Sequence, residues 1–171
     1  METRNFINGN FINSISKQKI RVLNPSNQQT VGFIDEGLDD EIDLAFSAAS
    51  KAFKNRLLQD MDSSIKSNMM RSIASKIREY KEVGSKILSQ ENGKTIDQCA
   101  GEFEGAASVF EYYAGLTDKI ENKLIPSGID TFNYILLEPY GVSLQIIPWN
   151  YPIALIARSV AVSLVVGNTM V

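Results

Sequence analysis

The sequence predicts an α/β fold in which small β-hairpins and several helices precede a strand–turn–helix unit. Three observations support this prediction. Residues 1–38 alternate short apolar runs with turn signals, and residues 39–119 place apolar side chains at helical spacing. Residues 141–171 begin with a buried apolar strand that turns into a helix. A chain of 171 residues is long enough for one ordinary domain with its own core.

Composition excludes several functional classes. Apolar residues make up 44% and charged residues 22%, which is typical of a globular protein. The net charge of -3 and the lack of a Lys/Arg-rich block argue against nucleic-acid binding. The chain has no histidine, so histidine-dependent triads and histidine-ligated metal sites are excluded, and we expect no metal. With Cys99 as the single cysteine, no internal disulfide can form, and a reducing, cytoplasmic setting is expected.

Two hairpins are expected in residues 1–38. Asn8-Gly9 lies between the apolar pairs Phe6-Ile7 and Phe11-Ile12, which is the strongest short hairpin signal. Further along, Ile20–Leu23 and Thr30–Ile34 flank a turn that contains Asn24 and Pro25.

Residues 39–119 are predicted to be helical. One helix is expected over Asp40–Lys54 and a second carries an apolar stripe of Ile65, Met69, Ile73, Ile77 and Tyr80. A shorter helix from Glu82 should end at Asn92, where Gly93 suits a left-handed cap. Thr95 and Gln98 form a capping box that opens a long helix with Cys99, Phe103, Ala106, Phe110 and Tyr113 facing inward. Glu102 and Glu104 are expected to face outward, and Cys99 is interpreted as a small buried hydrophobe.

The remaining residues divide into an arm and a strand–helix unit. Within residues 120–140, Phe132–Leu137 should form a strand that Pro139 ends. Gly141–Ile147 is predicted as a buried strand, Pro152–Val166 as a helix, and the next strand is expected at about Thr169. A parallel sheet needs that returning strand, so we expect an incomplete domain whose last helix exposes an apolar face. Replacing Leu164 by lysine is then expected to improve solubility.

Val142–Val171 contains one charged residue, Arg158, which raises the alternative of a C-terminal membrane anchor. Pro148, Asn150 and Pro152 interrupt this run, and the segment after Pro152 is shorter than the roughly 20 residues needed to span a bilayer. Arg158 near its middle costs about 2.5–3.5 kcal/mol on insertion scales. A buried helix is therefore favoured, and no membrane partner is expected.

The segment Ile146–Pro152 is the strongest candidate for a functional site. In a doubly wound sheet, the junction between a strand and the following helix lies at the edge where ligands bind. An asparagine amide such as that of Asn150 can donate hydrogen bonds to a developing oxyanion. The alternative is that Asn150 caps the helix and Trp149 fills the core, and the spacing by itself favours this alternative. Neither a Gly-x-Gly-x-x-Gly fingerprint nor a phosphate-binding loop is present.

Three segments resemble the aldehyde dehydrogenase superfamily in residues and in spacing. They are Glu138-Pro139-Tyr140-Gly141-Val142, Ile147-Pro148-Trp149-Asn150-Tyr151-Pro152 and Gly167-Asn168-Thr169-Met170-Val171. Upstream, Phe6-Ile7-Asn8-Gly9, Asn24-Pro25, Ala45 through Phe53 and Glu91-Asn92-Gly93-Lys94 follow the order of that family. The resemblance covers essentially the whole chain and implies the N-terminal part of an aldehyde dehydrogenase-like fold, ending in the first strand–helix unit of a Rossmann-like sheet.

The resemblance also implies an activity and the roles of particular residues. In that family, a cysteine thiolate attacks an aldehyde, and NAD or NADP accepts hydride as the carboxylic acid forms. Asn150 would be the side-chain donor of the oxyanion hole. Ile146, Ile147, Pro148 and Trp149 would line the cofactor cleft. Residues 120–140 would form a β arm that bridges subunits.

The family's nucleophilic cysteine, general-base glutamate, Gly-x-Thr-x-x-Gly segment and a lysine that follows the Asn168-Thr169 stretch are absent from residues 1–171, and Cys99 does not match the nucleophile. We therefore expect these residues by themselves to lack dehydrogenase activity and to bind cofactor poorly. Two interpretations remain open. The chain works with a second chain that carries the remaining domain, or it is a non-enzymatic remnant that acts as an interaction or homo-oligomerisation module.

Overall fold

The computed structural model describes residues 2–171, and its N-terminal part consists of short strands. Both predicted hairpins are confirmed, the first around Asn8 and Gly9, which have the positive φ values (52° and 77°) of a tight hairpin turn. β1 adds to the second hairpin in parallel with β5, giving a sheet of order β1-β5-β4. The strands are β1 (Glu2–Thr3), β2 (Asn5–Ile7), β3 (Asn10–Ile12), β4 (Lys19–Leu23) and β5 (Thr30–Asp35).

The predicted helices all form, with ends within one or two residues of those expected. The Thr95–Gln98 capping box opens α4, and Gly93 and Gly167 adopt the left-handed conformation (φ +80° and +95°) that ends α3 and α5. The helices are α1 (Asp39–Lys54), α2 (Ser63–Glu79), α3 (Lys81–Asn92), α4 (Ile96–Ala114) and α5 (Pro152–Val166).

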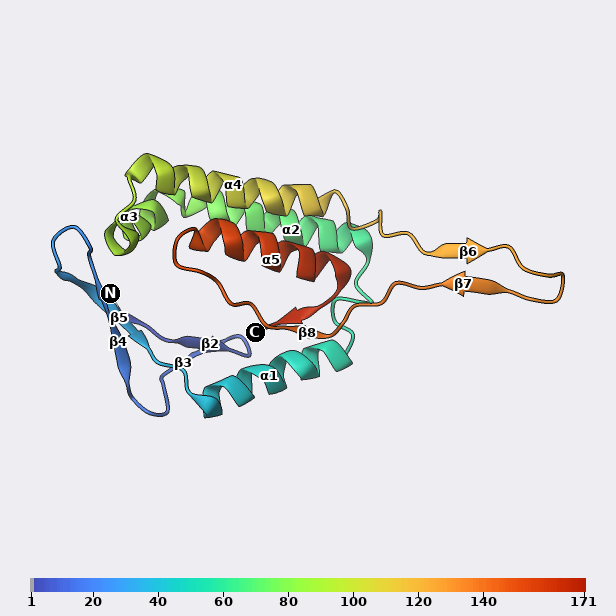
Figure 1. Ribbon diagram of the computed structural model, residues 1–171, viewed down its shortest axis with the longest axis horizontal. Coiled ribbons are helices and arrows are strands. Elements are labelled where there is room, and N and C mark those ends of the chain that lie inside the picture. The colour runs from blue at the N-terminus through green and yellow to red at the C-terminus, as the bar shows by residue number, and fades with distance from the viewer. Residues whose placement is uncertain (1) are drawn as a thin grey trace.

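The core lies where α4 packs between α2 and α5. Most of its fully buried side chains are alanines, which let the helix axes approach closely: Ala74 from α2, Ala106, Ala107 and Ala114 from α4, and Ala157 and Ala161 from α5, together with Met70 and Phe110. On the other side of α5, β8 (Val142–Ser143) and β9 (Thr169–Met170) separate it from α1, as Figure 1 shows. The result is a layered arrangement in which α5 is central.

The buried face of α2 differs from the predicted stripe. Ile65 and Tyr80, at the two ends of that stripe, are 58% and 60% exposed, whereas Met70 and Ala74 are fully buried. The buried line is thus rotated by about one residue, because α4 presents alanines there and the helices meet most closely opposite small side chains. Met69, Ile73 and Ile77 of the predicted stripe lie beside this line and remain partly buried.

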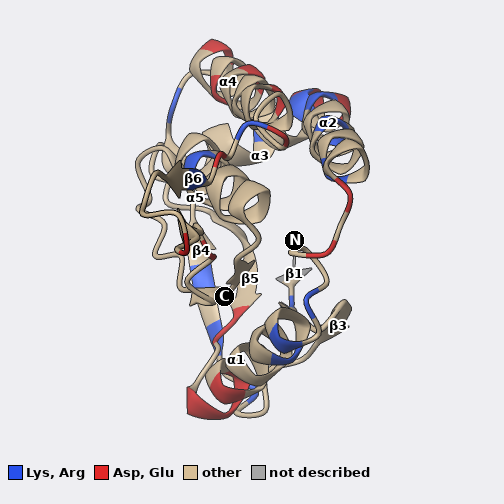
Figure 2. Cartoon of the chain, turned by 90° about the vertical axis from the view of Figure 1, so that its right-hand side faces the viewer, with Lys and Arg blue, Asp and Glu red and all other residues tan. Residues whose placement is uncertain are grey.

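Charges reinforce the edge of the α2–α4 contact. Arg78 of α2 donates from Nε to Glu104 at 2.7 Å and from Nη2 to Glu111 at 2.9 Å, both on α4. In Figure 2, α2 and α4 lie side by side, and both carry charged residues. These hydrogen bonds raise the pKa of Arg78 and lower the pKa of both glutamates. Glu104 therefore faces a charged partner at the helix seam.

The strand–helix unit forms, but its strand is shorter than predicted, and the prediction of a buried strand through Ile147 is wrong: Leu144 is 56% and Ile146 is 84% exposed. β8 and β9 pair in parallel, and the backbone N–H of Gln145 still donates to the Val171 carbonyl at 2.7 Å. Regular strand structure, expected through Ile147, stops at Ser143, because β9, the strand it pairs with, is only two residues long. None of the helices within residues 2–171 combines the length and apolar character needed to cross a membrane.

The arm projects away from the helices. β6 (Lys123–Ile125) pairs antiparallel with β7 (Asn133–Ile135), and the two strands extend beyond the body of the molecule in Figure 1. The predicted strand Phe132–Leu137 is thus real but shorter. Every residue of both strands is exposed, although the strands contain Leu124, Ile125, Tyr134 and Ile135.

Candidate functional site

The candidate site is the turn formed by residues 146–151, between β8 and α5. Pro152 occupies the first turn of α5, where the missing N–H of proline costs no hydrogen bond. Asn150 is exposed, and Trp149 is 80% exposed. The N-cap position belongs to Tyr151, without a side-chain capping bond. Both parts of the alternative interpretation are therefore wrong: Asn150 does not cap α5, and Trp149 does not fill the core.

Glu102 of α4 supplies the missing cap from another helix. Its Oε1 accepts from the backbone N–H groups of Ile153 at 2.8 Å and Ala154 at 3.2 Å. Its other oxygen, Oε2, pairs with Lys94 Nζ at 2.6 Å, and the Glu102 side chain is only 1% exposed. The prediction that Glu102 faces outward is thus wrong. A carboxylate at this place satisfies unpaired amides and the positive end of the α5 dipole.

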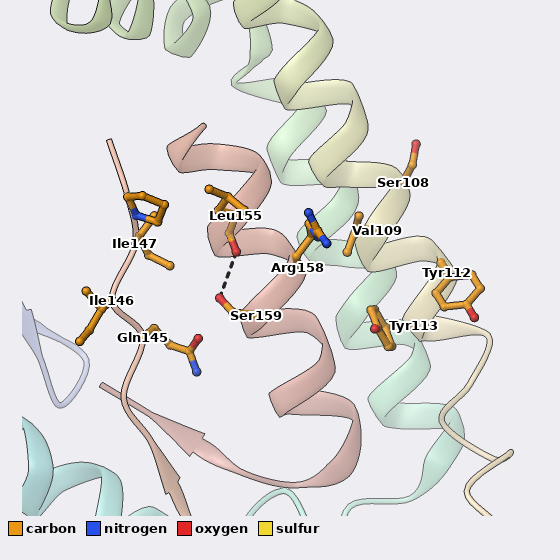
Figure 3. Close-up of a pocket in the computed structure, with 11 residues that line it drawn as sticks. Ser108, Val109, Tyr112, Tyr113, Gln145, Ile146, Ile147, Leu155, Arg158 and Ser159 are labelled. Carbon is orange, nitrogen blue, oxygen red and sulfur yellow. Dashed lines mark hydrogen bonds between the residues drawn. The ribbon is translucent and has the colours of Figure 1, made fainter. Parts of the chain in front are cut away.

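A cavity of about 710 Å³ lies between this segment, α5 and α4. Ile146, Ile147 and Pro148 line it, whereas the predicted fourth cofactor residue, Trp149, does not. Figure 3 shows Ile147 directed toward α5 and Ile146 directed away, and Ile146 is 84% exposed. The opposite walls come from Leu155, Arg158 and Ser159 of α5 and from Ser108, Val109, Tyr112 and Tyr113 of α4. The cavity thus has an apolar wall from the turn and one cationic side chain.

Cys99 does not contribute a reactive thiol to this site. It is completely buried in a small cluster with Leu88 and Phe103, as the sequence predicted. Burial is the largest effect on this thiol and raises its pKa. The Lys94 ammonium lowers the pKa and the Glu102 carboxylate raises it, and the net direction is upward. A thiol in these surroundings is inert.

The sequence that forms this site matches a known protein family. The sequence profile described as "Aldehyde dehydrogenase family" matches residues 11–171. The chain belongs to this family. Two of the segments that carry the resemblance lie in this region: Ile147–Pro152 forms the turn before α5, and Gly167–Val171 runs from the C-cap of α5 through β9.

An aldehyde dehydrogenase of Aspergillus niger is 34% identical to this chain. The match covers 97% of this chain and 33% of the Aspergillus protein. The betaine aldehyde dehydrogenase of Bacillus subtilis (strain 168) is 34% identical over 97% of the chain and 34% of its own length. The chain therefore spans about a third of the length of the curated relatives it matches.

Solved structures show the same architecture. A variant of the betaine aldehyde dehydrogenase of Staphylococcus aureus, in complex with NAD+, superposes with a TM-score of 0.94 at 32% identity, covering 98% of this chain and 34% of that one. An aldehyde dehydrogenase variant from Bacillus cereus gives a TM-score of 0.96 at 30% identity, covering 100% and 35%. The fold is thus that of the N-terminal part of aldehyde dehydrogenase structures, as predicted.

Proposed function

We propose that residues 1–171 form the oxyanion-binding part and one wall of the cofactor cleft of an NAD(P)-dependent aldehyde dehydrogenase, which oxidises an aldehyde to a carboxylic acid. The exposed position of Asn150, in the turn between a parallel strand and the helix that follows it, carries this proposal. In open α/β sheets, ligands bind at this place.

The role of Asn150 follows from the charge that develops during the reaction. When a thiolate adds to an aldehyde, the carbonyl oxygen gains negative charge, and the Asn150 side-chain amide donates a hydrogen bond to it. Removing one such donor typically lowers the rate about 10²–10³-fold. The only thiol in the chain, Cys99, is buried and inert, so these residues supply a donor without its nucleophile.

The cofactor of the proposed reaction is NAD or NADP, which accepts hydride when bound. The apolar wall formed by Ile146, Ile147 and Pro148 suits a flat ring, and the adjoining cavity of about 710 Å³ is of the size that cofactor sites have. The exposed indole of Trp149 adjoins this wall in the chain. Ile146, Ile147 and Pro148 form one side of the proposed cleft, and Trp149 extends it in the chain. Residues 1–171 contain no phosphate-binding loop, so we expect weak cofactor binding by these residues themselves.

A chimera provides the test. Residues 1–171 are joined in frame to the remaining two thirds of the B. subtilis betaine aldehyde dehydrogenase, and betaine aldehyde-dependent NADH formation is measured. The purified 171-residue chain should give none. In the chimera, Asn150→Ala should lower kcat about 10²–10³-fold while the protein remains folded. An undiminished kcat, or activity of the 171-residue chain, contradicts the proposal.

A second candidate function rests on the arm. Its exposed apolar strands suit association with a copy of this chain or with a second chain that carries the remaining domain. In this proposal, the chain acts as an interaction or oligomerisation module, whether or not it contributes to catalysis. The accompanying proposal of a reducing, cytoplasmic setting agrees with Cys99 being a free thiol.

A further inference from the structure

We propose that Asn92, Lys94 and Glu102 are positioning residues that fix the turn carrying Asn150. This inference rests on the proposed function of Asn150 as an oxyanion donor. Asn150 itself lies exposed in an irregular segment, outside any strand or helix. A donor in such a place contributes to catalysis only if its surroundings hold it, because a misplacement of 1 Å can lower a rate about 10²-fold.

The side of the turn after Asn150 is held by Glu102 and Lys94. Glu102 binds the amides of Ile153 and Ala154 and pairs with Lys94, whose side chain is only 13% exposed. Lys94 Nζ also lies 3.6 Å from the centre of the Tyr151 ring, which is a cation–π contact. A buried carboxylate therefore joins the helix start to the residue that follows Asn150.

The side before Asn150 is held by Asn92. Its side-chain Nδ2 donates to the Trp149 carbonyl at 2.6 Å. Asn92 ends α3, Lys94 lies in the connection to α4, and Glu102 lies in the second turn of α4. The corner between α3 and α4 therefore contacts both neighbours of Asn150. The two sets of contacts are separate, since Asn92 contacts backbone outside α5 and Glu102 contacts backbone inside it.

The opposite end of α5 shows what a purely structural contact looks like. Lys66 of α2 is buried, and its Nζ donates to the Val165 carbonyl at 3.4 Å, in the last turn of α5. Glu102 and Lys66 thus place opposite charges at opposite ends of one helix, each with the sign that complements its dipole. Only Glu102 lies beside the candidate site, so Lys66 serves as the matched control.

The test uses the 171-residue chain, ¹⁵N-labelled, in three variants: Asn92→Ala, Glu102→Gln and the control Lys66→Gln. Trp149 is the only tryptophan, so one indole N–H signal reports on the turn, and the Asn150 side-chain amide is followed beside it. In Asn92→Ala and Glu102→Gln, both signals should move toward random-coil positions. Amide exchange of Ile153 and Ala154 should accelerate about tenfold in Glu102→Gln, because the neutral amide oxygen of glutamine accepts these hydrogen bonds more weakly than the charged carboxylate.

Lys66→Gln should leave the Trp149 and Asn150 signals in place, even where its melting temperature falls. Asn92→Ala removes no buried charge, so it keeps the test valid if Glu102→Gln unfolds. Unchanged signals in Asn92→Ala, or equal shifts in Lys66→Gln, overturn the inference. These measurements need no enzyme activity, so their failure is distinct from a failure of the Asn150→Ala chimera.

Discussion

Buried carboxylates in this chain bind backbone amides of distant segments. Glu41, at the start of α1, is 3% exposed, and its oxygens accept from the backbone N–H of Ile15 at 2.6 Å and of Leu38 at 3.0 Å. It therefore ties the β3–β4 connection to the first turn of α1. Glu102 does the same for the start of α5. In both cases an acidic side chain satisfies amides that a helix or loop leaves unpaired.

Glu41 makes the stability of the folded chain depend on pH. Hydrogen bonds from Ile15 and then Leu38 lower its pKa below the ordinary 4.5. Because the folded-state pKa is the lower one, the stabilisation is fully present above about pH 4.5 and is lost as pH falls through the folded value. Glu41→Gln should lower the melting temperature at pH 7 and flatten its decline below pH 4.5. Thermal unfolding followed by circular dichroism from pH 3 to 7 measures both, and parallel curves for the two proteins contradict the assignment.

Single residues show where prediction from the sequence ends. The turn that contains Asn150 could be selected because Pro148, Trp149 and Pro152 mark it within a local pattern, whereas the role of Asn150 itself rests on the family resemblance. The sequence predicts an outward-facing Glu102 because helical periodicity indicates only which side of α4 is apolar. Its partners Ile153 and Ala154 lie about fifty positions further along, and no local pattern connects them. Polar contacts between distant segments need the tertiary structure.

At the scale of elements, the sequence predicts where helices begin and end better than it predicts which face of each helix is buried. Thr95 caps the start of α4 and Gly93 caps the end of α3. Each acts on helix residues only a few positions away, so the neighbouring sequence predicts where the helix begins or ends. The buried side of α2 depends on α4, and that of α5 on both neighbours. The predicted α2 stripe is consequently offset from the buried line through Met70 and Ala74.

The same reasoning corrects the expectation for Leu164. Leu164 packs against the core cluster with Ala157 and Ala161, whereas Val162 is 37% exposed on another side of α5. Leu164→Lys should therefore lower the free energy of unfolding by about 1–3 kcal/mol, because it removes apolar burial. Val162→Lys should raise solubility with little change in stability. Urea unfolding and the saturation concentration of each variant measure these effects, and a stable, more soluble Leu164→Lys variant contradicts the packing.

At the scale of the whole molecule, the chain combines a helical core with an arm that this core leaves uncovered. Residues of the arm are exposed to a degree unusual for their type: Leu124 is 66% and Phe132 is 76% exposed. An isolated two-stranded sheet is only marginally stable in water, since it buries too little apolar surface. Covering the arm with another chain would bury this apolar surface, which is the basis of the proposed role in association.

Association through the arm can be measured directly. Leu124→Lys in β6 combined with Phe132→Lys just before β7 places charges on the exposed apolar arm and should raise the dissociation constant of self-association at least about tenfold, because charges at the centre of an apolar interface are poorly tolerated. Leu57→Lys is the matched control, since Leu57 is an exposed leucine (59%) outside the arm. Sedimentation velocity over a range of concentrations gives the constants. A monomeric parent, or an equal effect of Leu57→Lys, contradicts a self-associating arm and leaves a second, different chain as its partner.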